Sequence, residues 1–165
     1  RRASRPHVAL LGRIPGTRRF SDLERHQDNE LIDSVLVFRP DSSLLYFNMD
    51  HVRDTILDRA RAEATLPRLV VLDLSAAPYV DMHGAHMLAE LAGELTAAGV
   101  RVQAVEAHAS VRQRLRSEGV DAKLGAVNRF TSVADVVEDF QKHGAPSPSP
   151  SGQPERGTGP GSGRC

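Results

Sequence analysis

The sequence lacks the features that mark disulfide-stabilised secreted proteins and membrane-spanning proteins. Cysteine occurs once, at Cys165, so no intrachain disulfide can form, which fits a reducing compartment. Long apolar runs are missing too: residues 8–11 and 69–72 each span four residues, whereas a membrane-spanning helix needs about 20. The basic start from Arg1 to Arg5 leads straight into a short strand-like run, which is not the pattern of a signal peptide. We therefore expect this chain not to cross a bilayer.

The chain also lacks an excess of charge of either sign. Lys and Arg number 21, and so do Asp and Glu, so no global charge draws the chain to nucleic acid. Its 165 residues have room for one domain with a proper core. Because the chain does not begin with Met, it could be a fragment of something longer.

Apolar periodicity predicts a small α/β layer fold, a mixed sheet flanked by helices. Strands are expected at residues 8–11, 35–38, 44–47, 69–72 and 100–105. The second and third strands are separated by a turn and predict a hairpin, and residues 12–34 predict a polar loop. Residues 69–72 are apolar on both faces, which indicates a central strand covered by helices on each side.

Helix boundaries are marked by capping residues. Asn48 or Asp50 is expected to cap a helix whose apolar stripe is Val52, Ile56 and Ala60. Asp81 is a good cap for the next helix, which Gly99 should end. The spacing of Ser132 and Asp135 is that of a capping box, and it predicts a last helix with Val133, Val136, Val137 and Phe140 on one face.

The C-terminal residues 143–165 predict a disordered tail. From residue 144 onward, fifteen of the 22 residues are Gly, Pro or Ser. Such a segment has too few apolar groups to offset the entropy of ordering it. We therefore place the folded domain at residues 8–142.

Three stretches resemble one known family. They are residues 11–17 (Leu-Gly-Arg-Ile-Pro-Gly-Thr), residues 37–48 and residues 73–84, which run from Asp-Leu-Ser to Asp-Met-His-Gly. In this order they are similar to the C-terminal cytoplasmic STAS domain of SulP-type (sulphate permease family) anion transporters. The resemblance covers roughly residues 8–142. It implies a STAS-type fold, a position on the cytoplasmic side of the cell membrane, and a transporter that is typically a homodimer.

One position departs from the related anti-anti-sigma factors. In that branch a serine follows the Asp at the start of the second helix and accepts phosphate, whereas this chain has Met82. A thioether has no hydroxyl, so no phosphorylation is expected at the family's acceptor position. An exposed methionine suits an adaptable apolar contact, while a methionine packed into the core is the competing interpretation. The candidate contact surface is Val80, Asp81, Met82, His83 and Gly84.

Other motifs have plainer explanations. The loop between Gly12 and Gly16 lacks the Gly-Lys-Ser/Thr ending of a phosphate-binding loop. His83 and His86, with Asp81 nearby, lack an evident third metal ligand on the same face, so no metal site is predicted. No catalytic constellation is recognisable, so we expect no enzyme and no cofactor. Weak nucleotide binding near the loop before Asp81 stays open by analogy with some STAS domains.

The sequence therefore predicts the regulatory and assembly domain of a sulphate-type secondary anion transporter, acting through protein contacts. Its expected partner is the transmembrane domain of the same transporter, and no nucleic acid is expected. The alternative is a free-standing anti-anti-sigma-like binding module. A small nucleotide-binding enzyme is a third interpretation, which no residue pattern supports.

Overall fold

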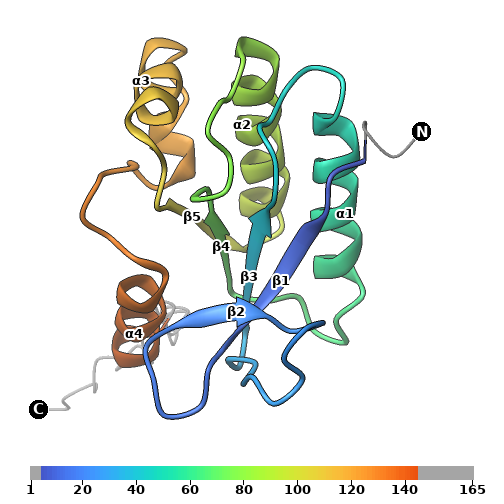
Figure 1. Cartoon of the computed structure of the whole chain (residues 1–165), viewed down its shortest axis with the longest axis vertical. Coiled ribbons are helices and arrows are strands. Elements are labelled where there is room, and N and C mark those ends of the chain that lie inside the picture. Colours follow the sequence, from blue (N-terminus) through green and yellow to red (C-terminus); the bar gives the residue numbers. More distant parts are fainter. Residues whose placement is uncertain (1–4, 145–165) are drawn as a thin grey trace, which may run out of the picture.

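A computed structural model describes residues 5–144 of the chain, and these form one five-stranded mixed sheet flanked by helices (Figure 1). The strands are β1 (Val8–Arg13), β2 (Phe20–Asp22), β3 (Val35–Pro40), β4 (Leu69–Asp73) and β5 (Arg101–Val105). The helices are α1 (Met49–Arg61), α2 (Met82–Ala97), α3 (Ala109–Ser117), the short 3₁₀ helix η2 (Asp121–Leu124) and α4 (Val133–His143). The predicted α/β fold is confirmed.

The sheet has the order β2-β1-β3-β4-β5, with the parallel strands on one side. Strand β4 pairs in parallel with β3 and with β5, while β1 is antiparallel to both β2 and β3. All five residues of β4 are buried. The prediction of a strand covered on both faces is therefore confirmed for residues 69–72.

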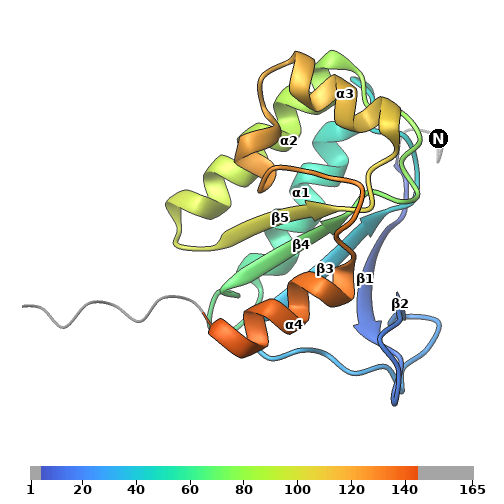
Figure 2. The same cartoon turned by 90° about the vertical axis from the view of Figure 1, so that its left-hand side faces the viewer.

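Two hydrophobic cores fill the space on either side of the sheet. Helices α1, α2 and α3 cover one face and α4 covers the other, as Figure 2 shows. Alternate strand residues point to opposite cores, so Leu72 packs with the first group of helices and Val71 packs towards α4. The predicted stripe of α1, Val52, Ile56 and Ala60, is fully buried.

Three helix boundaries follow the predicted capping chemistry. The Asp81 carboxylate accepts a hydrogen bond from the backbone N–H of Gly84 at 2.7 Å. Ser132 and Asp135 form a reciprocal capping box at the start of α4. Gly99 follows α2 with a φ of +86°, in the left-handed region where glycine carries little strain.

The predicted hairpin of residues 35–38 and 44–47 is wrong. Strand β3 takes β1 as its antiparallel partner, and Leu44 makes only an isolated parallel bridge with Val80. The aromatic run was interpreted as a strand because it is apolar, yet Tyr46 and Phe47 are exposed and lie in a turn that leads into α1. The apolar residue types of this segment favour a strand, but they do not show that two of its side chains are exposed.

Two further local predictions need correction. Residues 12–34 are not all loop, because β1 continues through Gly12 to Arg13 and β2 lies at Phe20–Asp22. Gly12 permits a close approach instead of ending the strand: a Cβ there would collide with Leu23. Asn48 precedes α1, but its side chain does not cap the helix; it accepts from the N–H of Leu45 and donates to the carbonyl of Ser43.

The predicted disordered tail lies outside the described residues apart from residues 143 and 144, of which His143 closes α4. Between residues 5 and 144, no helix is both long enough and apolar enough to span a membrane.

Candidate functional site

Two loops meet at the carboxyl ends of the parallel strands β3 and β4, and this is where the predicted contact surface lies. The β3–α1 loop contributes Leu44, whose N–H donates to the carbonyl of Tyr79 at 2.9 Å. The carbonyl of Leu44 in turn accepts from the N–H of Asp81 at 3.1 Å. These bonds hold the β4–α2 loop against the β3–α1 loop, so residues far apart in sequence share one edge of the domain.

Asp81 fastens the two loops with its side chain. One carboxylate oxygen caps α2 through Gly84, and the other accepts from the backbone N–H of Tyr46 at 2.8 Å. The same carboxylate thus satisfies a free amide of the helix and an amide of the neighbouring loop. We conclude that Asp81 positions the surface.

Four exposed apolar side chains lie on these loops and at the start of α2, and we call them the exposed patch. They are Tyr46, Phe47, Tyr79 and Met82, with exposed fractions of 70%, 51%, 67% and 60%. The rings of Tyr46 and Phe47 meet edge to face, with their centroids 5.3 Å apart. Among residues 5–144, three other large hydrophobic residues are exposed, namely Leu31, Leu66 and Phe130. More than half of such residues therefore gather at this one edge, as is typical of interaction sites.

The five residues predicted from the sequence divide between surface and interior. Met82 and His83 are exposed and Asp81 is partly exposed. Val80 and Gly84 are buried, so their side chains cannot belong to a contact surface. The carbonyl of Val80 accepts from Nε of Arg114 at 3.2 Å, and a Cβ on Gly84 would collide with the backbone of Leu44. Val80 and Gly84 therefore support the surface from the interior of the domain.

The exposure of Met82 bears on one of the two sequence interpretations of that side chain, and the contact surface itself stays a prediction. Packing of Met82 into the core is wrong, because most of its surface is open to solvent. Tyr46, Phe47 and Tyr79 are not among the residues predicted from the sequence, because the first two fall in the predicted second strand of the hairpin. The signal that could have found them is two adjacent aromatic residues followed directly by a helix start.

The geometry at the start of α2 does not favour phosphate. The N–H of Gly84, which could otherwise face an anion, is already bonded to the Asp81 carboxylate, and that carboxylate is itself negative. A hollow of about 990 Å³ lies elsewhere, lined by the second half of α2, by β5 and by residues of and next to η2. Gly12 is part of a strand, so the Gly12–Gly16 stretch forms no phosphate cradle.

The histidines of α2 are not assembled into a metal site in the described residues. Nε2 of His86 lies 3.0 Å from a carboxylate oxygen of Glu118, on the residue after α3. The Asp81 carboxylate is occupied by two backbone amides. Over residues 5–144, the group of His, Asp and Glu side chains that does converge is a different one, His7, Asp22 and Glu24.

Comparisons with known proteins agree with the fold and with the sequence motifs. The family model of the STAS domain matches residues 26–136. High affinity sulfate transporter 2 of Stylosanthes hamata is 26% identical over 145 residues, which cover 83% of this chain and 22% of that transporter. The chain therefore spans about a fifth of the length of such relatives.

Solved structures show the same fold. The murine Solute Carrier 26 family member A9 anion transporter aligns with a TM-score of 0.74 and 22% identity, over 83% of this chain and 22% of that chain. The anti-sigma factor antagonist SpoIIAA aligns with a TM-score of 0.56 and 14% identity, over 68% of this chain and 94% of that chain. The STAS-type fold predicted from three sequence stretches is confirmed.

Proposed function

This chain belongs to the STAS domain family, and we propose that it serves a sulfate-type anion transporter as its cytoplasmic regulatory and assembly domain. The observation that carries the proposal is that most of the chain aligns with about a fifth of a sulfate transporter. In this proposal residues 8–142 are the STAS unit, and the path of the anion lies in a transmembrane domain outside this chain. The domain itself catalyses no reaction.

The partner in this proposal is the transmembrane domain of the same transporter, within a homodimer. Four apolar side chains exposed at one edge provide a surface that a second protein part can bury. Burial of apolar area stabilises such a contact by about 25 cal/mol for each Å² removed from water. Aromatic rings and methionine are also side chains that protein interfaces favour at their centres.

The proposed regulation works through this contact and not through phosphorylation at residue 82. Met82 stands in the first turn of α2 without a hydroxyl group. The amide two residues further on, at Gly84, is already bonded to Asp81. This arrangement supports an apolar contact over the free-standing anti-anti-sigma-like module, whose acceptor serine is missing here.

The test is uptake of sulfate by the parent transporter carrying Met82→Asp. A charged side chain placed in an apolar contact must be desolvated, so we expect uptake to fall several-fold. The isolated domain should keep its melting temperature, because residue 82 is exposed and an acid is tolerated near a helix N-terminus. Met82→Leu keeps an apolar side chain and should retain uptake.

A matched control is Leu31→Asp. Leu31 is also an exposed apolar residue, but it precedes β3, whereas the patch lies beyond the carboxyl ends of β3 and β4. Equal loss of uptake in both Asp variants would show that the exposed patch has no special role. Normal uptake with normal stability in Met82→Asp would contradict the contact proposal. The transporter assignment is tested separately, by searching the adjoining coding sequence for apolar segments of about 20 residues.

A further inference from the structure

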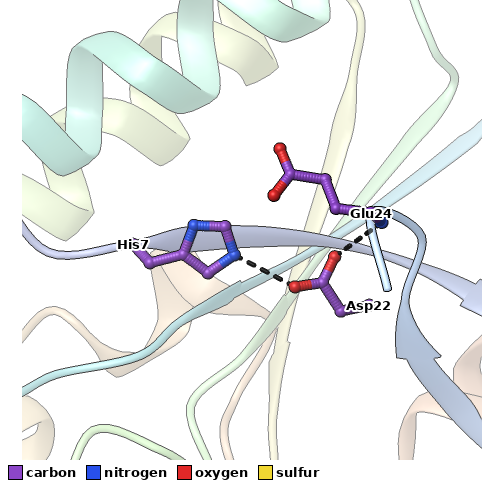
Figure 3. A group of neighbouring side chains, drawn as sticks. All are labelled: His7, Asp22 and Glu24. Carbon is purple, nitrogen blue, oxygen red and sulfur yellow. Dashed lines mark hydrogen bonds and ion pairs between the residues drawn. The ribbon is translucent and has the colours of Figure 1, made fainter. Parts of the chain in front are cut away.

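Three side chains with metal-binding atoms converge where the start of β1 lies beside the end of β2 (Figure 3). His7 immediately precedes β1, Asp22 is the last residue of β2, and Glu24 follows in the turn. One ligand atom from each lies within 4.8 Å of the other two. Figure 3 shows the imidazole and both carboxylates turned towards one common space.

The backbone fixes two of these residues before any ligand arrives. The carbonyl of His7 accepts from the N–H of Asp41 at 2.9 Å, which extends the pairing of β1 with β3. Asp22 is held by its register opposite Leu11, and the next amide, of Leu23, donates to the carbonyl of Leu10. The sheet therefore fixes the backbone positions of His7 and Asp22, and the three side chains adjust when the ion binds.

The charges of the cluster favour a cation. The Asp22 side chain is more than nine-tenths buried, and its oxygens contact His7 at 3.0 Å and the N–H of Glu24 at 2.9 Å.

The Glu24 carboxylate has no hydrogen bond or ion pair to any residue between 5 and 144. A second carboxylate thus lies near that of Asp22 without a positively charged partner of its own. Two like charges at this spacing repel each other unless a positive charge lies between them.

We propose that His7, Asp22 and Glu24 form a binding site for a divalent transition-metal ion of the Zn²⁺ class. One imidazole with two carboxylates is a ligand set that such ions accept, with water completing the coordination. Two ligand atoms on one tetrahedral Zn²⁺ stand about 3.3 Å apart. The 3.0 Å between Nε2 of His7 and the Asp22 oxygen is close to that spacing, so a small shift opens room for the ion.

A bound ion joins the residue before β1 to the end of β2. It replaces a single hydrogen bond between His7 and Asp22 by three bonds to one centre, and so fixes how the edge strand β2 lies on the sheet. The metal site uses none of the four residues of the exposed patch and needs no partner protein, so it can be tested separately from the proposed transporter role.

The experiment titrates Zn²⁺ into the full 165-residue chain by calorimetry, with Co²⁺ absorption as a second readout of coordination. Cys165→Ser serves as the background, because a thiolate is a competing zinc ligand. We expect one ion per chain, a higher melting temperature with Zn²⁺, and affinity at least about tenfold weaker in Glu24→Gln and in His7→Gln. Both residues are exposed, so neither variant should unfold the domain.

The matched control is His86→Gln, which removes another histidine that faces a carboxylate, that of Glu118. It should bind Zn²⁺ like the background protein. Unchanged affinity in Glu24→Gln and His7→Gln would overturn the proposal, and so would loss of binding only in His86→Gln. Binding that saturates only in millimolar zinc, or Co²⁺ spectra identical to those of the aqueous ion, would overturn it as well.

Discussion

Truncation of Leu72 to alanine should be among the most damaging single changes in this domain. Leu72 is fully buried in β4, opposite Phe38 of β3 and Ala104 of β5, and it packs into the core under α1, α2 and α3. Leu72→Ala removes three carbon atoms, which at about 0.8 kcal/mol each gives roughly 2 kcal/mol of lost transfer free energy. Strands on both sides limit collapse, so the cavity term raises the total to about 3–4 kcal/mol.

Urea denaturation of the chain measures this loss directly. With a slope of about 2 kcal/mol/M, the midpoint should fall by about 1.5–2 M while the slope itself stays unchanged. Leu31→Ala is the matched control, because it makes the same chemical change at an exposed position and should cost less than about 0.5 kcal/mol. Equal midpoint shifts in the two variants would refute the assignment of β4 to the core.

Three further outcomes are expected. Partial burial, together with the negative charges of Asp73 and Asp135, raises the pKa of Glu106 in the folded domain. The ionised form of Glu106 therefore opposes folding. The free energy of unfolding should fall as pH rises through the range between the pKa of Glu106 in the unfolded chain and its pKa in the folded chain. Glu106→Gln should therefore melt higher than the wild type at pH 7, with the difference vanishing below the ordinary pKa of glutamate. Ser132→Ala should lower the free energy of unfolding by about 1 kcal/mol. In an NMR titration the pKa of Asp135 should rise but stay below its usual value, because the variant loses the hydroxyl and keeps the two larger causes, the backbone N–H of residue 132 and the side chain of Arg18. Deletion of residues 145–165 should leave the melting temperature within error of the full chain, and a clear decrease would show that this segment contributes to the fold.

The parts of the structure that could be predicted from the sequence are those set by neighbours along the chain. Asp81, the Ser132–Asp135 pair and the stripe on α1 each follow from residues within one or two helical turns. The β3–α1 loop could not be predicted, because its contacts with Val80 and Asp81 join segments more than 30 residues apart. Aromatic residues fit a strand by propensity, and only these long-range bonds place Tyr46 at the surface.

The candidate sites divide in the same way. Met82 was found because it replaces a particular residue in a known motif. The three ligands at His7, Asp22 and Glu24 were missed, because their meeting depends on how β2 folds back along β1. The spacing of these three residues along the chain does not predict how β1 and β2 pair.

The two bonds of the Asp81 carboxylate have a mechanical consequence. The Asp81 carboxylate connects the loop that carries Tyr46 to the first turn of α2, because it accepts a hydrogen bond from each. Helix α2 is a stiff rod of 16 residues, roughly 24 Å long, and its far end adjoins the start of β5. The exposed patch and the start of β5 are therefore connected by a single helix, whose buried face packs against the sheet along its length.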